Sequence, residues 1–344
     1  MDGVTYLLPI KSTSPPGREL SDYLRRLSRA MPVLVVDGSD RAVFAQAQRE
    51  WGAFVEHVRP DPALACRNGK VHGVLTGLAR ATTPIVVIAD DDVRYGDDEL
   101  EACLAAIAGA DAVMPQNYFD PLPWHARWDT ARTLINRVTG GDFAGTVVVR
   151  RDALPGGYDG DVLFENLELM RTVCRNGGRV VLRDDLPVRR LPPTTRQFLA
   201  QRARQAYDEF ARPPRLAVQL AVLPLGAALA STRGRRGLAF LAVVTVAVAE
   251  AGRRRHGGRR MFPRTAPLFA PLWVGERAIT SWCALALFAR GGVRYGGSRI
   301  RRAASTSARA ARAAQGAAWA RTPIGWRPSS RPDRSCRSTV VGGQ

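Results

Sequence analysis

Cysteine is scarce in this sequence, and no cysteine is placed to bind zinc. The five cysteines are scattered over 344 residues, without a CxxC pair and without histidines at ligand spacing. This spacing argues against a zinc site and a disulfide framework, and it is typical of a protein in a reducing compartment. The N-terminus carries Asp2 and only a short apolar run, so we expect no signal peptide and a cytosolic first part.

Acidic residues almost disappear after residue 214. Residues 215–344 contain 23 Lys+Arg and three Asp+Glu, a net charge of +20, whereas residues 1–214 have a net charge of −1. Such a basic segment is typical of proteins that bind nucleic acid or an anionic membrane surface. Aromatic residues are not interleaved with the arginines as base-stacking platforms, so we expect no nucleic-acid partner.

The basic segment also lacks an apolar run long enough to span a membrane. Residues 216–230 and 238–249 are apolar runs of 15 and 12 residues, separated by STRGRRG, while a spanning helix needs about 20 residues. Arginines on both sides of the second run favour monotopic insertion into an anionic leaflet. Residues 266–289 form a longer run, interrupted by Glu276 and Arg277, that is a third candidate contact. A soluble helical extension packed on the first part is the alternative.

Before this segment, apolar strand patterns alternate with amphipathic helix patterns. The pattern predicts strands at 5–10, 33–36, 53–58, 85–89, 112–114, 146–150 and 179–182, and helices at 19–30, 41–50, 70–80, 97–108, 165–176 and 195–210. Residues 124–138 are either a helix or a loop. This alternation predicts an α/β fold with a mostly parallel sheet covered by helices on both faces.

Three adjacent acids, Asp90, Asp91 and Asp92, follow the apolar run 85–89. Open α/β sheets bind ligands where their strands end. Adjacent carboxylates repel one another unless a cation lies among them, and Mg²⁺ or Mn²⁺ prefers such oxygen ligands. A polar turn is the alternative for the triplet taken alone.

Two further helices begin with candidate site residues. Lys70 follows Asn68 and Gly69 at the start of a helix, where free backbone N–H groups and an ammonium suit a phosphate. Glu165 and Glu168 lie in the first turn of another helix, where acids also have a purely structural role through the helix dipole. For Lys70, an ordinary surface lysine is the alternative.

Together these segments resemble the GT-A nucleotide-sugar glycosyltransferases of the inverting family 2 type, and within it the branch that includes ceramide glucosyltransferases. The resemblance covers about residues 4–212. Five pieces occur in the family's order: VLVVDGSD, NGKVHGVLTGLARA, IADDDV, the paired segments VTGGDFAGTVVVRRDAL and GGYDGDVLFENLELMRTVCRNGGRVVL, and QRARQ. No single piece is specific, and their order carries the resemblance.

The resemblance implies a role for each matching residue. Asp92, with Asp90 as a second or water-mediated contact, would hold Mg²⁺ or Mn²⁺ at the diphosphate of the donor. Glu165 would be the general base, with Glu168 as the alternative. The remaining residues expected to contact the nucleotide sugar are Pro9, Asp37, Lys70, Asp90, Asp91, Gln201 and Arg204.

Two positions depart from the family pattern. Asn166 stands where the family has its catalytic Asp, and an amide cannot take up a proton. Gln205 stands where the family has Trp, which removes an aromatic platform. For this reason the sequence also allows a polyprenyl-phosphate glycosyltransferase, whose acceptor is already ionised, and a non-catalytic nucleotide-sugar-binding protein.

The sequence therefore predicts a metal-dependent inverting hexosyltransferase with three regions. Residues 1–212 form the GT-A catalytic domain, 213–292 form hydrophobic and basic membrane-associated helices, and 293–344 form a basic disordered tail. We expect a nucleotide-sugar donor, UDP-linked in preference to GDP-linked, and a lipid or lipid-linked acceptor. The expected location is the cytoplasmic face of the cell membrane.

Overall fold

Strands and helices alternate through the first 190 residues, as the sequence predicts. The computed structural model describes residues 1–140, 142–305 and 338–340. The strands of the main sheet are β1 (Val4–Ile10), β2 (Val33–Asp37), β3 (Glu56–Val58), β4 (Ile85–Ala89), β5 (Val93–Arg94), β6 (Ala112–Phe119), β7 (Thr146–Arg150), β8 (Val180–Arg190) and β11 (Ser338–Val340). The helices around it are α1 (Arg18–Ser28), α2 (Arg41–Trp51), α3 (Gly69–Arg80), α4 (Asp97–Ala106), α5 (Trp124–Thr139), α6 (Glu165–Arg175) and α7 (Thr195–Tyr207).

The main sheet is mixed, with a parallel half and an antiparallel insertion. Its order is β11-β8-β6-β7-β4-β1-β2-β3, with β5 paired to β8. Strands β3, β2, β1 and β4 are parallel to one another, whereas β7 is antiparallel to both β4 and β6. The carboxyl ends of β1, β2 and β4 therefore meet at one edge, and the expected α/β fold with its mostly parallel sheet is confirmed.

Side chains that alternate along the strands build a core on each face of the sheet. On β1, Tyr6 and Leu8 pack toward α1, α2 and α4, whereas Leu7 packs toward α3 and α6. Helix α3 lies close to β1 because its facing positions are glycines. A Cβ on Gly73 would lie 2.9 Å from the Cβ of Pro9, and one on Gly77 would lie 2.2 Å from Leu7 Cδ1. This close approach brings the N-terminus of α3 to the ligand edge.

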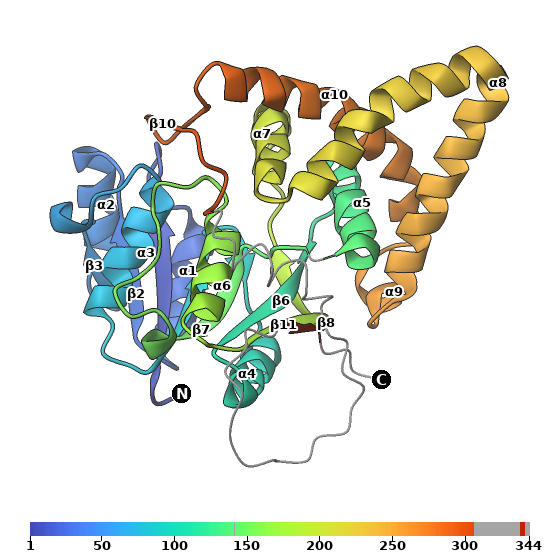
Figure 1. Ribbon diagram of the computed structural model, residues 1–344. Coiled ribbons are helices and arrows are strands. Elements are labelled where there is room, and N and C mark those ends of the chain that lie inside the picture. Colours follow the sequence, from blue (N-terminus) through green and yellow to red (C-terminus); the bar gives the residue numbers. More distant parts are fainter. Residues whose placement is uncertain (141, 306–337, 341–344) are drawn as a thin grey trace.

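Beyond the sheet, the two short apolar runs form one bent helix, α8 (Pro213–Arg254). Gly234 has φ 55° and ψ −144°, so the helix turns back at this glycine into two arms. Figure 1 shows the arms projecting from the sheet domain, with α10 (Ala270–Ala289) beside them. Each arm has about 20 residues and is about 30 Å long at 1.5 Å per residue.

The base of α8 is fixed to the sheet domain through Arg137 on α5. The Arg137 guanidinium donates to the carbonyls of Gly252 at 3.1 Å, Arg255 at 2.6 Å and Asp184 at 2.9 Å. The side chain is buried, so these bonds form away from water. The second arm of α8 is therefore docked on α5, with α9 (Gly258–Met261) following it.

The segment after α10 is folded where it is described, so the expectation of a disordered tail is wrong for residues 293–305. Strands β9 (Val293–Tyr295) and β10 (Ser298–Ile300) pair as a hairpin, and Ile300 packs into a cluster with α7 and α10. β11 adds a strand to the edge of the main sheet. The rest of 306–344 lies outside the described residues.

The cysteines agree only in part with the expectation of free thiols. Cys66, Cys103 and Cys283 are free. Cys174, at the end of α6, is disulfide-bonded, contrary to the expectation from spacing. Burial raises the pKa of the Cys103 thiol to about 12, so this cysteine is an inert part of the core.

Candidate functional site

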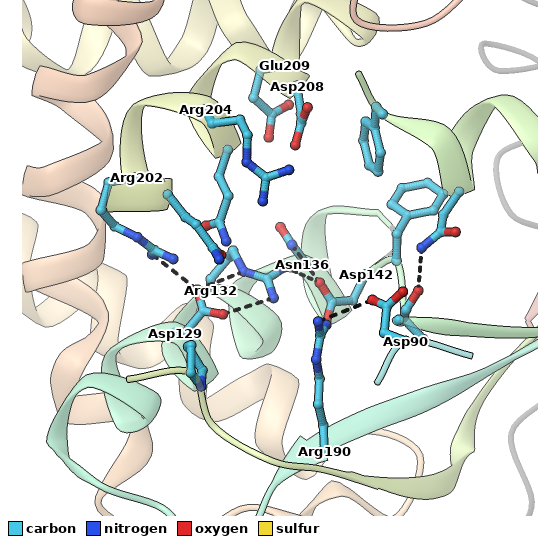
Figure 2. A pocket seen from close by; sticks show the side chains of 18 of the residues that line it. Asp90, Asp129, Arg132, Asn136, Asp142, Arg190, Arg202, Arg204, Asp208 and Glu209 are labelled. Atoms are coloured by element: carbon cyan, nitrogen blue, oxygen red, sulfur yellow. Dashed lines mark hydrogen bonds and ion pairs between the residues drawn. The ribbon is translucent and has the colours of Figure 1, made fainter. Parts of the chain in front are cut away.

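A pocket of about 210 Å³ opens at the ligand edge of the sheet. Figure 2 shows charged side chains from several elements converging on it. The predicted site residues that line it are Asp90, Asp92, Glu165, Gln201 and Arg204. Pro9, Asp37, Lys70, Asp91 and Glu168 are not among its lining residues, although Lys70 contacts two residues that are.

The acid triplet divides between the pocket and solvent. Asp90 and Asp92 are partly buried, with side chains 20% and 29% exposed, whereas Asp91 is exposed. Burial raises the pKa of the Asp92 carboxyl, although Arg190 opposes the shift. Asp92 Oδ1 is buried and has no hydrogen-bond partner among the described residues. The geometry therefore favours Asp90 and Asp92, not Asp91, as the pair that faces a ligand.

Two cations lie against these carboxylates. Lys70 Nζ lies 2.5 Å from Asp90 Oδ1 and 2.8 Å from Glu165 Oε1. Burial alone would lower the pKa of Lys70, but Asp90 and Glu165 outweigh it and hold the pKa well above its ordinary value. Arg190 lies on the other side, with Nε 2.9 Å from Asp92 Oδ2 and Nη2 3.3 Å from Asp90 Oδ2. Lys70 and Arg190 thus lie where they would attract a negatively charged diphosphate. They would repel a positively charged metal ion bound with it.

The start of α3 holds Lys70 in this position. Asn68 is the N-cap residue, and its Oδ1 accepts from the backbone N–H of Lys70 at 3.1 Å and of Val71 at 3.4 Å. Its Nδ2 donates to the Val162 carbonyl at 2.9 Å, three residues before Glu165. Asn68 is fully buried. One asparagine therefore connects the helix that carries Lys70 to the segment that carries Glu165.

Asn166 is held by a bond that an aspartate could not make. Its Nδ2 donates to the Ala144 carbonyl at 2.8 Å. An ionised carboxylate has no hydrogen to donate, so an Asp here would place two acceptors face to face. Asn166 lines the pocket beside Glu165. The amide at position 166, where the family pattern has Asp, therefore makes a hydrogen bond that holds α6 beside the pocket.

The alternative base, Glu168, does not line the pocket, and its contacts favour a structural role. Its side chain is fully buried. Oε1 accepts from Arg175 Nη2 and from Ser305 Oγ, and Oε2 accepts from the Ser305 backbone N–H, each at 2.7 Å. Although it lies only three residues after Glu165, this carboxylate does not line the pocket and instead contacts Ser305, in the chain that follows β10. Glu168 therefore anchors that chain to α6.

Helix α7 supplies the wall of the pocket that carries the Gln and Arg of the predicted box. It begins with a capping box between Thr194 and Gln197, which fixes its direction. Gln201, Arg204 and Gln205 then face the pocket. The Arg204 guanidinium lies 5.0 Å from the ring centroid of Tyr295, a cation–π contact with the β9–β10 hairpin.

The turn after α7 adds two acids that the sequence analysis missed. The 3₁₀ helix η4 (Asp208–Ala211) brings Asp208 and Glu209 to the pocket. Burial raises the pKa of Asp208 to about 7, and repulsion from Glu165 adds to the shift. Asp208 Oδ1 has no hydrogen-bond partner among the described residues. In the sequence, the one signal for Asp208 as a pocket residue is its position four residues after Arg204, on the same face of the helix.

The floor of the pocket is a buried network from α5, which is a helix and not the alternative loop. Arg132 contacts Asp129 at 3.1 Å and also pairs with Asp142, and Arg202 of α7 contacts Asp129 at 3.1 Å. Figure 2 shows this network below Arg204. Burial would raise the pKa of Asp129, but the two arginines outweigh it and hold the pKa well below its usual range. The network fixes α5 against α7.

Two predicted donor contacts lie apart from this pocket. Pro9 is buried against Gly73. The Asp37 carboxylate accepts from the Ser39 backbone N–H at 2.8 Å and contacts His57 Nε2 at 3.1 Å. Burial opposes ionisation of Asp37, but His57 and Ser39 outweigh it and lower the pKa. Both oxygens thus have protein partners, and contact with a nucleotide stays a prediction.

The chain is similar to solved structures of glycosyltransferases. The mannosyltransferase PcManGT from Pyrobaculum calidifontis, in complex with GDP-Man and Mn²⁺, has 20% sequence identity and a TM-score of 0.54, over 81% of this chain and 87% of that chain. Mannosyl-3-phosphoglycerate synthase from Rubrobacter xylanophilus is less similar, with 14% identity and a TM-score of 0.39, over 57% of this chain and 69% of that chain. No family model and no curated protein sequence matches the chain. The chain therefore has a GT-A glycosyltransferase fold.

Proposed function

We propose that the protein is an inverting glycosyltransferase that moves a hexose from a nucleotide sugar to a lipid or lipid-linked acceptor. The observation that carries the proposal is the set of charges around one pocket at the ligand edge of a GT-A fold: Asp90 and Asp92 on one side, Lys70 beside them, and Arg204 on α7. Sugar transfer needs a site that neutralises a leaving diphosphate, and these residues suit that task. The finer likeness to ceramide glucosyltransferases stays a prediction.

The donor set of the pocket fits a divalent metal ion. Two carboxylates, one with an unpartnered buried oxygen, suit Mg²⁺ or Mn²⁺ completed by substrate phosphate and water. Among the described residues, no three or more His, Cys, Asp or Glu side chains are grouped so that they could hold a metal ion by themselves. When bound, such an ion supplies positive charge at the diphosphate.

The protein's own cations would act at the same diphosphate. Arg204 offers planar paired donors, and Lys70 offers a compact charge that pairs with Asp90 and Glu165. A diphosphate that binds Lys70 would compete with Glu165 for the ammonium, so donor binding would free the carboxylate. If the acceptor is a hydroxyl, Glu165 would then be its general base, on the side opposite the diphosphate.

Two residues favour a second candidate function. Asn166 cannot act as a base, and Gln205 cannot serve as an aromatic platform, so a non-catalytic nucleotide-sugar-binding protein has the same pocket. This candidate predicts donor binding without turnover. A transferase whose acceptor is already ionised would stay active with Asn166 and Gln205 at these positions. We prefer this function because it gives a role to all the charged residues of the pocket.

The proposed acceptor and location rest on the apolar surface of the C-terminal helices. Apolar side chains that are exposed on α8, α10 and the turn before α10 are Val218, Leu223, Leu225, Leu238, Phe240, Val243, Val244, Leu268, Leu272, Ile279, Trp282 and Leu285. Within the described residues, α8 is the one helix long and apolar enough to cross a membrane, by length and composition. Its turn carries Arg233, Arg235 and Arg236, which favours insertion into the cytoplasmic leaflet over crossing it.

A donor panel tests the proposed activity. The full chain in detergent is incubated with UDP- and GDP-linked hexoses and a lipid extract, with and without Mn²⁺, and release of nucleoside diphosphate is measured. We expect Mn²⁺-dependent release with at least one donor, and loss of release in Asp92→Asn but not in the exposed control Asp98→Asn. Binding of a donor without release would favour the non-catalytic candidate. Failure of every donor to bind would refute both.

Cell fractionation tests the proposed location. We expect the protein to sediment with membranes and to need detergent for release. A Ser231→Cys substitution, in a protein whose Cys283 is replaced by Ser, places a thiol near the turn of α8. In intact cells, a membrane-impermeant maleimide should not label this thiol. Labelling in intact cells would show that the turn crosses the membrane. Recovery in the supernatant without detergent would contradict membrane association altogether.

A further inference from the structure

The β9–β10 hairpin carries an aromatic side chain, Tyr295, next to its turn. The two strands are joined by Gly296 and Gly297, whose φ angles are 58° and 94°. A two-residue turn with both φ angles positive matches the twist of the paired strands, and glycine adopts this conformation without strain. Tyr295 is the last residue before the turn. The turn therefore fixes the place of Tyr295 at the tip of the hairpin.

The chain that follows the hairpin is bound to two elements of the site. Tyr207, at the end of α7, donates from its hydroxyl to the Arg301 carbonyl at 2.7 Å. The backbone N–H of Phe164 donates to the Ala303 carbonyl at 2.8 Å. Phe164 is the residue directly before Glu165. The hairpin is therefore held beside both α7 and the segment that carries the candidate base.

Tyr295 contacts the guanidinium of Arg204 on α7. The guanidinium carbon lies 5.0 Å from the centroid of the Tyr295 ring. Within the described part of the chain, the Arg204 side chain makes no hydrogen bond and no ion pair, and Figure 2 shows it projecting into the pocket without a dashed contact. An aromatic face attracts a guanidinium by charge and does not use its N–H groups. The donors of Arg204 therefore stay available to a ligand in the pocket.

The hydroxyl of Tyr295 belongs to the electrostatic surroundings of the site but carries no charge there. Burial raises the pKa of Tyr295, the Glu165 carboxylate adds to the shift, and Arg204 opposes it. The ordinary value is about 10, so the hydroxyl stays protonated near pH 7. Tyr295 does not itself line the pocket. Its ring, and not an ionised oxygen, is therefore what it contributes, and it acts on the pocket through Arg204.

We propose that Tyr295 is a positioning residue for the donor, whose ring holds the Arg204 guanidinium toward the pocket so that Arg204 binds the diphosphate. The inference rests on the proposed function and adds a residue to its donor site. An arginine without a partner samples several rotamers, and ordering it costs free energy when a ligand binds. A ring that orders Arg204 beforehand removes part of this cost. Because position 205 carries Gln, the aromatic ring beside Arg204 comes from the hairpin and not from α7.

The test measures binding of UDP and of GDP, each with Mn²⁺, to the full chain in detergent by titration calorimetry. The variants are Tyr295→Phe, Tyr295→Leu, Arg204→Gln and the double variant of the last two. Arg294→Gln, an exposed position on the same hairpin, is the control. We expect Tyr295→Leu to raise the dissociation constant of the bound nucleotide about fivefold or more, because the ring is lost. Tyr295→Phe keeps the ring and should stay within about twofold of the wild type, as should the control.

A double-mutant cycle separates positioning from a general structural effect. If Tyr295 acts through Arg204, its loss should add little in Arg204→Gln, so the double variant should bind as weakly as Arg204→Gln alone. An equal loss of affinity with and without Arg204, or unchanged affinity in Tyr295→Leu, would overturn the inference. A loss in Tyr295→Phe would also overturn it, because the hydroxyl and not the ring would then matter.

Two further results keep this inference distinct from the proposed function. Thermal melts without ligand show whether each variant is folded, and Tyr295→Met replaces Tyr295→Leu in the cycle if the latter does not fold. If the wild type binds a nucleotide and the cycle shows no coupling, only the role of Tyr295 is removed. If the wild type binds neither UDP nor GDP, the proposed function fails and this inference falls with it.

Discussion

Arg190 lies between Asp90 and Asp92, 3.3 Å from the first carboxylate and 2.9 Å from the second. The carboxylates hold the pKa of Arg190 above its ordinary value although burial opposes this. The guanidinium thus occupies the electrostatic position that the acid triplet predicts for a metal ion. Charge on Arg190 and charge on a metal ion repel each other, so the two should compete for the same pair of carboxylates.

This relationship predicts that Arg190→Gln strengthens metal binding in the absence of donor. Removing one cation beside two carboxylates should lower the dissociation constant for Mn²⁺ by roughly tenfold. Without metal, the same variant should melt at a lower temperature because two partly buried acids lose their partner. Titration calorimetry and thermal melts with Mn²⁺ or EDTA measure both effects. Arg189→Gln, which removes an exposed pair with Asp120, is the control, and equal Mn²⁺ affinity in the two variants would contradict the competition.

The sequence predicts the frame of the site but not Arg190, and the reason lies in strand β8. The apolar residues at 179–182 indicate a short strand, but the structure continues β8 to Arg190 through RDDLPVRR, which has no apolar alternation. That extension depends on pairing with β6 and β5, which is tertiary information. Asp90, Lys70 and Glu165 were predictable because each follows a local signal: the end of an apolar strand, or the start of a helix.

The inward position of Arg277 beside the pocket was unpredictable for a related reason. Arg212 and Arg277 are 65 positions apart and belong to a segment with many other arginines. Composition alone assigns them all to a basic surface. Only the packing of α10 against α7 and α8 turns Arg277 inward and leaves Arg290 exposed. The same packing explains why Glu276 and Arg277, which interrupt an apolar run in the sequence, do not interrupt the apolar surface.

Glu168→Ala should destabilise the protein without affecting donor chemistry. The substitution leaves Arg175 without its carboxylate and releases the backbone of Ser305, at a cost of roughly 3 kcal/mol for a broken buried pair. Chemical denaturation of the full chain measures the loss. At a temperature where the variant is folded, release of nucleoside diphosphate should equal that of the wild type. A folded variant without release would restore Glu168 as a catalytic candidate.

Glu165→Gln distinguishes the two classes of acceptor. If the acceptor is a lipid phosphate, no proton is removed, and the rate constant for transfer should stay within about tenfold of the wild type. A hydroxyl acceptor would require the base, and the rate should fall by roughly 10²-fold or more. Single-turnover transfer to a polyprenyl phosphate measures the rate apart from binding. A fall beyond 10²-fold with this acceptor would make Glu165 the base and contradict the ionised acceptor.

Asn166→Asp provides the matched variant for this comparison. It restores the carboxylate of the family pattern but removes the donor to the Ala144 carbonyl. We expect a lower melting temperature because the hydrogen bond to the Ala144 carbonyl is lost. The rate of transfer to a polyprenyl phosphate should not increase, because this acceptor has no proton to be removed. A faster transfer in Asn166→Asp would show that proton removal limits the wild-type enzyme.

Asp208 should make stability depend on pH in a defined direction. Burial raises its pKa to about 7 in the folded protein, above the value of about 3.9 in an unfolded chain. The folded state therefore holds a proton on Asp208 that the unfolded state has lost, and this contribution to stability, complete below about pH 4, disappears as the pH rises through 7. Asp208→Asn should match the wild type near pH 4 and melt at a higher temperature above pH 7. Melting curves between these pH values, with exposed Asp98→Asn as the control, measure the difference. A difference that stays constant across the range would show that Asp208 is ionised throughout.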